Sequence, residues 1–130
     1  MTTKEHIKHW LDSAEYDLLV SESLFQAGHY SWCLFIGHLV LEKTLKALFV
    51  QSAKNEIPPK IHNLLKLAEL SQIKLTEEQL NLFADINRFH IEGRYTEYKN
   101  EINKIATKDF SILYIQKIKE QHLWLKSLIT

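Results

Sequence analysis

Residues 32–50 read WCLFIGHLVLEKTLKALFV, and this stretch decides the fold because its apolar side chains are too many for one stripe of a helix. The apolar residues of its first half are Trp32, Leu34, Phe35, Ile36, Leu39, Val40 and Leu41. A helix that is apolar around most of its circumference is buried on more than one side. We therefore expect a helix at residues 30–54 and, because one bundle interior would leave part of this surface uncovered, a homodimer.

A polar row interrupts the same helix. His38, Glu42 and Lys46 are spaced by four residues, so they share one side of the helix, and Glu42 is well placed for an ion pair with Lys46. One interpretation is a structural polar network of His38, Glu42 and His62, where His62 is expected to hydrogen-bond at a helix start. The other is a pocket wall in which Lys46 contacts a phosphate. Structural ion pairs are common, which favours the network.

Capping signals and apolar spacing predict the helices that flank this stretch in the first half of the chain. Thr2 and Glu5 form a capping box for a helix at residues 3–26, and Gly28 is a suitable stop. The two prolines of NEIPPK, residues 55–60, forbid a continued helix and prepare the start of a short one.

The second half is expected to contain two more helices separated by a polar connection. Thr76 and Gln79 repeat the capping box for a helix that continues to Gly93. Residues 94–106 have little periodicity, and such long connections are usually functional or mobile. Thr107 caps the last helix. The pattern predicts a single all-α domain, an antiparallel up-and-down four-helix bundle with an additional short helix.

The composition excludes several classes of protein. Lys plus Arg and Asp plus Glu both total 16, so no global field attracts nucleic acid or lipid in bulk. Cys33 is the single cysteine, and the first residues lack the apolar core of a signal peptide, so we expect a cytoplasmic protein. No apolar run reaches the roughly 20 residues that span a membrane.

Three segments together resemble one known family. They are WLDSAEYDLLVSESLFQAGHYSWCLFIGHLVLEKTLKALFV at residues 10–50, IHNLLKL at 61–67 and NRFHIEGRY at 87–95. In their order and spacing they are similar to the HEPN domains, named for higher eukaryotes, prokaryotes and nucleotide binding. The resemblance implies a helical bundle, often a homodimer, frequently encoded beside a minimal nucleotidyltransferase in a toxin-antitoxin-like module.

The resemblance also allows a ribonuclease, but the expected motif is missing. Many HEPN ribonucleases carry an Arg that is followed by His after four to six intervening residues. The corresponding positions are Gly93, Arg94 and Tyr95 after Arg88, and Lys99, Asn100 and Glu101 after Arg94. We therefore expect a non-catalytic, nucleotide-binding partner of a nucleotidyltransferase. A ribonuclease toxin with a displaced motif and a structural dimerisation domain remain alternatives.

The two arginines of the chain suggest where a nucleotide would bind. Arg94 follows a helix-breaking glycine and suits bidentate phosphate contact, with Lys46 as a second charge and Tyr95 as a stacking surface. A rival hypothesis pairs Arg94 with Glu42. Arg88, still within the predicted helix, is expected at the surface or an interface. Neither a metal site nor any cofactor besides the nucleotide is expected.

Overall fold

The computed structural model describes the backbone of residues 1–90 and 96–130 and the side chains of residues 1–90 and 100–130. The described residues form six helices, α1 (Thr3–Gln26), α2 (Tyr30–Ser52), α3 (Leu64–Leu70), α4 (Glu77–Asn87), α5 (Thr96–Ile105) and α6 (Lys108–Ser127). No strand occurs in the described backbone. The all-α prediction is confirmed.

The predicted helix starts are present because polar side chains satisfy the first backbone N–H groups. Thr2 and Glu5 form the capping box of α1, with Oγ1 of Thr2 accepting from the Glu5 N–H at 3.1 Å. Thr76 and Gln79 do the same for α4. The hydroxyl of Thr107 caps α6 through the N–H of Phe110, 3.2 Å away.

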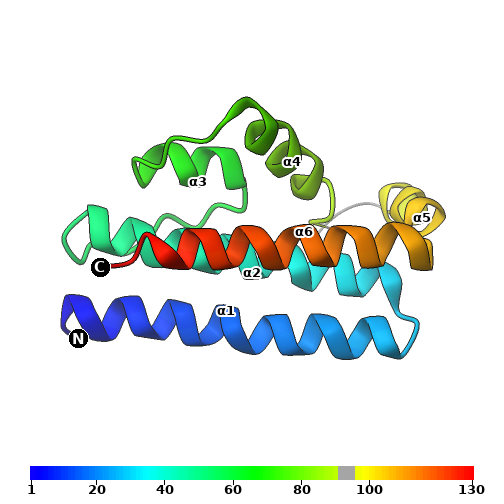
Figure 1. Cartoon of the computed structure of the whole chain (residues 1–130), viewed down its shortest axis with the longest axis horizontal. Coiled ribbons are helices and arrows are strands. Elements are labelled where there is room, and N and C mark those ends of the chain that lie inside the picture. Colours follow the sequence, from blue (N-terminus) through cyan, green and yellow to red (C-terminus); the bar gives the residue numbers. More distant parts are fainter. Residues whose placement is uncertain (91–95) are drawn as a thin grey trace.

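Three long helices, α1, α2 and α6, lie side by side, and α3 and α4 lie together over one side of them (Figure 1). Helix α1 runs opposite to α2, but α6 runs in the same direction as α2 (Figure 1). The segment from α3 to α5 therefore carries the chain back along α2 before α6 begins. The second and fourth limbs of an up-and-down bundle run in the same direction, as α2 and α6 do. The returning limb, however, consists of the short helices α3, α4 and α5 rather than one long helix (Figure 1), so the predicted four-helix bundle is not confirmed.

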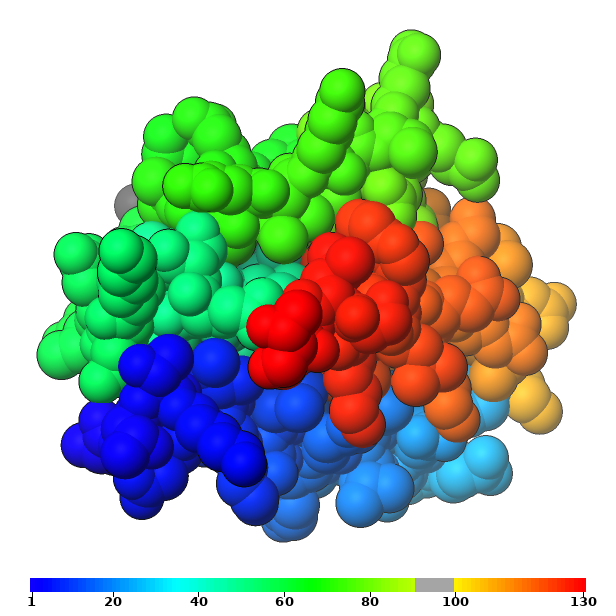
Figure 2. Space-filling model, turned by 60° about the vertical axis from the view of Figure 1, so that its left-hand side comes forward, coloured from blue at the N-terminus to red at the C-terminus, as the bar shows by residue number. Residues whose placement is uncertain are grey.

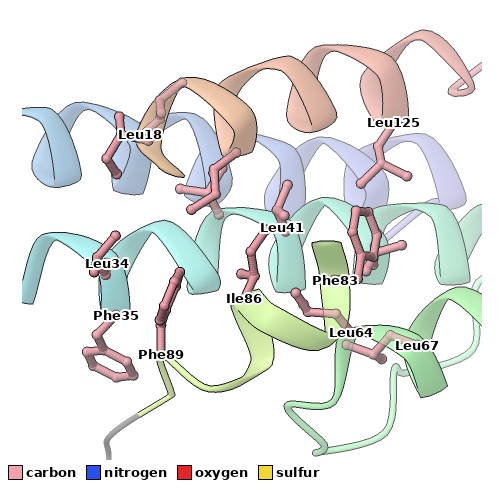
Figure 3. Close-up of a cluster of buried hydrophobic side chains, with 14 of the residues drawn as sticks. Leu18, Leu34, Phe35, Leu41, Leu64, Leu67, Phe83, Ile86, Phe89 and Leu125 are labelled. Carbon is pink, nitrogen blue, oxygen red and sulfur yellow. The ribbon is translucent and has the colours of Figure 1, made fainter. Parts of the chain in front are cut away.

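Helix α2 is the centre of the fold, and it contacts α1, α3, α4, α5 and α6. Of the seven apolar residues in its first half, only Trp32 is exposed, at 49%. The core around α2 draws Leu18, Leu64, Phe83, Ile86, Phe89 and Leu125 from the surrounding helices and turns (Figure 3). The chain itself buries four of these seven side chains and half-buries Ile36 and Leu39, so the all-round apolar character of α2 does not by itself require a homodimer.

Gly37 lets α6 approach α2 closely. A Cβ atom at this position would lie 2.9 Å from Cδ1 of Ile118 and 3.3 Å from Cδ1 of Ile115. The C-terminal part of α6 then lies between the first turns of α1 and the α3–α4 layer (Figure 2). None of the described helices combines the length and the hydropathy that a membrane-spanning segment needs.

The predicted connection at residues 94–106 is wrong, because residues 96–105 form α5. Ile102 and Ala106, four residues apart, are buried at the end of this segment, and Ile105 is half-buried. A spacing of three and four residues is the helical pattern. The polar residues before Ile102 concealed this short apolar face.

Candidate functional site

The polar row of α2 is buried against two turns of the α3–α4 layer. His38 is fully buried, and the side chains of Glu42 and Lys46 are only 5% and 7% exposed. His62, just before α3, and His90, just after α4, complete the group. We call these five residues the buried cluster. Burial of so many ionisable groups is costly unless they are paired or hydrogen-bonded.

His62 links the turn before α3 to α2 through two atoms. Its Nδ1–H donates to Oε1 of Glu42 at 2.9 Å, and its backbone carbonyl accepts from Nε2 of His38 at 2.9 Å. The cap of α3 is Asn63, whose Oδ1 accepts from the N–H groups of Leu65 and Lys66. His62 thus forms hydrogen bonds at the start of α3, toward α2, whereas its neighbour Asn63 caps the helix itself.

Helix α4 ends at Asn87 rather than near Gly93, and this early end places His90. The N–H groups of Arg88, Phe89 and His90 bond to carbonyls three residues back, so the chain tightens beyond the helix. Asn87 anchors the turn, since its Oδ1 accepts from the N–H of Leu64 at 2.8 Å. Arg88 is the exposed C-cap residue of α4 rather than a residue within it.

His90 packs among the other aromatic rings of the cluster. Its ring stacks on that of His62 with 4.1 Å between centroids and 19° between planes. The His38 ring lies 5.2 Å away and the Phe35 ring 5.5 Å away. Three imidazoles from three segments of the chain thus surround the carboxylate of Glu42.

The hydrogen bond to a carbonyl determines the protonation of His38. A carbonyl only accepts, so Nε2 carries the hydrogen and Nδ1 of the neutral ring keeps its lone pair. Burial lowers the pKa of His38 from 6.5 to about 4, although the nearby Glu42 carboxylate opposes the shift. Nδ1 has no hydrogen-bond partner among the described residues and lies 3.9 Å from Oε1 of Glu42.

Of the three predicted phosphate-binding residues, Lys46 is the one that the described part of the chain contains. Nζ of Lys46 donates to Oε2 of Glu42 at 3.1 Å and lies 5.4 Å from the ring centre of Trp10. A phosphate contact by Lys46 would therefore break a buried ion pair. This geometry favours the structural network over the pocket wall as the interpretation of Lys46. Arg94 and Tyr95 lie outside the described residues, as does the rival Arg94–Glu42 pair.

A small cavity of about 140 Å³ opens beside the cluster. Its lining residues are His62, Asn63, Asn87 and His90. The Asn87 amide donates to Oδ1 of Asn63 at 3.0 Å, which ties the two turns together. The sequence interpretation did not assign Asn63, Asn87 or His90 to a site, and their proximity to the α2 row had no local signal.

Comparisons with known proteins agree on the fold. The family model described as the HEPN domain matches residues 7–126. The crystal structure of TT1696 from Thermus thermophilus has a TM-score of 0.77 and 16% sequence identity, covering 94% of this chain and 97% of that one. None of the curated proteins compared matches the sequence.

Proposed function

Because the chain belongs to the HEPN domain family, we propose that it binds the phosphate-bearing part of a nucleotide in the cavity beside the buried cluster. In this proposal the protein is the non-catalytic member of a toxin-antitoxin-like module whose other member is a nucleotidyltransferase. The observation that carries the nucleotide site is the cavity itself, where hydrogen-bonding side chains converge at the mouth of a rigid, buried network.

One lining residue has a donor group available to a phosphate oxygen. Oδ1 of Asn63 accepts three hydrogen bonds, and its Nδ2 group makes none among the described residues. Nδ1–H of His62 is held by Glu42, so Nε2 of the neutral ring, on a side chain that is 48% exposed, is an acceptor. Amide N–H groups donate well to anionic oxygens.

The size of the cavity limits what it holds. A volume of about 140 Å³ is below the several hundred Å³ usual for a whole small-molecule ligand, so it suits a phosphate group, with the base outside. Arg94 and Tyr95 follow His90 by four and five residues in the sequence. We assign them to the second phosphate contact and to base stacking, and we assign Lys46 to the support of Glu42.

Calorimetric titration of ATP, GTP and a dinucleotide tests the proposal. Asn63→Asp is the sharpest variant, because aspartate keeps the helix cap but replaces the donor with a negative charge. We expect Asn63→Asp and Arg94→Ala to weaken binding at least tenfold, which is about 1.4 kcal/mol. Lys119→Ala, at an exposed ion pair on α6, should bind as wild type does.

Thermal melts establish that each variant is folded before it is titrated. Absence of binding of all three ligands to the wild-type protein would reject the nucleotide site. Equal affinity of wild type and both folded variants would reject the residue assignment.

A second function is favoured by the hydrogen bond between Glu42 and His62. A carboxylate that accepts from Nδ1 fixes the tautomer of the imidazole and leaves Nε2 as a general base. This geometry would serve a HEPN ribonuclease with a displaced motif. Incubation of the pure protein with labelled RNA in EDTA tests it, and cleavage that is lost in His62→Gln would favour the ribonuclease.

Assembly and compartment remain parts of the proposal. We propose a homodimer in the cytoplasm, and the dimer would use surfaces other than the covered face of α2. Sedimentation velocity at micromolar concentration separates monomer from dimer. Co-purification with a nucleotidyltransferase encoded by an adjacent gene tests the two-component module, and a protein that has only the structural role of an interaction domain would assemble without binding a nucleotide.

A further inference from the structure

Three metal-ligating side chains of the buried cluster converge without any contribution from exposed acidic groups. One ligand atom each of His38, Glu42 and His90 lies within 4.8 Å of the other two. Two of these residues come from successive turns of α2, and the third comes from the turn after α4. A tetrahedral zinc ion holds ligands about 2.1 Å from itself and hence about 3.4 Å from one another. Small side-chain movements would close the group to that spacing.

The lone pair on Nδ1 of His38 is the observation that points to a ligand. The Nε2–H group of His38 donates to the His62 carbonyl, so Nδ1 of this buried, neutral ring carries no hydrogen. Nδ1 has no partner among the described residues, and its nearest acidic atom is Oε1 of Glu42, 3.9 Å away. A buried lone pair facing a carboxylate oxygen is unfavourable unless a cation or a proton lies between them.

The surroundings orient these ligands as in known metal sites. Ligating histidines usually donate their other N–H to a carbonyl or carboxylate, as His38 does to the His62 carbonyl. Oε1 of Glu42 already accepts from His62, and a carboxylate oxygen has a second lone pair for an ion. The cavity lined partly by His62 and His90 gives the ion a path from solvent.

We infer that His38, Glu42 and His90 bind one divalent transition-metal ion per chain, with Zn²⁺ as the preferred ion. Two imidazoles and one carboxylate suit Zn²⁺ better than the oxygen-seeking Mg²⁺ or Ca²⁺. Three protein ligands leave a fourth position for water or a ligand oxygen. The site holds the ion whether or not a nucleotide binds, so the metal inference is tested independently of the proposed function.

Lys46 offers a direct test of this metal site. Its ammonium group lies 3.1 Å from the other oxygen of Glu42, so it repels the ion and competes for the carboxylate. Lys46→Met keeps most of the side-chain volume and removes the charge. The Lys46→Met variant should therefore bind Zn²⁺ roughly tenfold more tightly than wild type does. If Lys46 had a purely structural role, its replacement would give no such gain.

The experiment is a calorimetric titration of ZnCl₂ into protein freed of metal with EDTA and then exchanged into buffer without chelator. We expect one ion per chain and a rise in the melting temperature of about 10 °C at a hundredfold excess over Kd. His38→Gln and His90→Gln should each weaken binding at least a hundredfold. His29→Gln, at an exposed histidine in the turn before α2, is the matched control and should bind as wild type does.

X-ray absorption of the wild-type zinc complex keeps the test decisive if a variant at fully buried His38 does not fold. Its spectrum should show two imidazole nitrogens at about 2.0 Å and a carboxylate oxygen. The inference is overturned if wild type binds no Zn²⁺, if folded His38→Gln binds as tightly as wild type, or if the spectrum shows no imidazole ligands.

Discussion

Two buried polar groups lie on different sides of α2, and they differ in how they reach the surface of the protein. The buried cluster faces α3 and α4, whereas Thr44 faces α6 and forms a second group with His122, Glu15 and Lys126, which we call the α6 network. In the α6 network, Thr44 donates to the Val40 carbonyl at 2.8 Å and accepts from Nδ1 of His122 at 2.8 Å.

The α6 network closes on a surface ion pair, since Glu15 contacts both His122 and Lys126. The buried cluster instead presents His62 to a polar cavity. Both groups hold a buried imidazole nitrogen without a hydrogen-bond partner among the described residues, Nδ1 of His38 and Nε2 of His122. Both groups contain buried histidine, so burial of a polar side chain does not by itself identify a site. A cavity beside an unpartnered ligand atom is the more informative observation.

The largest expected difference between the two groups concerns their carboxylates. Glu42→Ala leaves Lys46 as a buried, unpaired charge and takes the acceptor from His62, so it should lower the free energy of unfolding by about 3–5 kcal/mol. Urea denaturation at pH 7 measures the change. Glu42→Gln retains an acceptor oxygen and should lie between wild type and Glu42→Ala, and a loss below about 1 kcal/mol in Glu42→Ala would show that the pair is not buried in solution.

The second prediction concerns pH. The folded-state pKa of His38, about 4, lies below the unfolded value near 6.5, so the unfolded chain binds more protons between these values. The contribution of His38 to the free energy of unfolding is therefore fully present above pH 6.5 and decreases as the pH is lowered. Between pH 7 and pH 5 this loss is about 2 kcal/mol. Glu42, His62 and His90 face this ring, and burial lowers the pKa of His122 too, which adds a loss of the same sign.

Denaturation in EDTA at several pH values measures this slope without bound metal. His38→Gln removes one titrating group, so its stability should change less between pH 7 and pH 5 than that of wild type. Equal slopes for both proteins would contradict the assignment of the proton to His38.

The third prediction tests the α6 network through its hydroxyl. Thr44→Val has a similar shape but cannot accept from Nδ1 of His122, so it should cost about 1–2 kcal/mol. Zinc affinity should stay at the wild-type value, because Thr44 lies outside the buried cluster. A changed affinity would mean that the two groups are coupled through α2.

The smallest effect is expected for Glu15→Ala. The Glu15 side chain is 38% exposed, and solvent screens its pairs with His122 and Lys126. Its removal should change the free energy of unfolding by less than about 1 kcal/mol. Measured beside Glu42→Ala under the same conditions, it shows whether depth of burial separates the two groups, and equal losses would contradict that explanation.

The predictability of the fold varied along the chain for identifiable reasons. The starts of α1, α4 and α6 follow from local capping residues, so the sequence was sufficient to predict them. Helix α5 was missed because, among its described side chains, the buried apolar positions begin only at Ile102. The end of α4 was misplaced because the amide of Asn87 binds α3, a contact that no local pattern reveals.

The candidate site was predictable only in part. The spacing of His38, Glu42 and Lys46 on one helix was enough to expect a polar row with an internal ion pair. The roles of Arg94 and Tyr95 stay predictions, since both lie outside the described residues. His90 was counted as a continuation of α4, because its proximity to His38 depends on how three separate segments meet.

The amino-acid sequence was enough to predict that the protein is helical, that α2 is buried and that a charged pair accompanies it, because helical periodicity and capping act over a few residues. The tertiary structure was needed to show that α2 and α6 pack directly against each other and that His62 and His90 stack beside Glu42. These relations join residues that lie far apart in the sequence, and many distant pairings are compatible with the same local pattern. The packing of the whole core selects one of them.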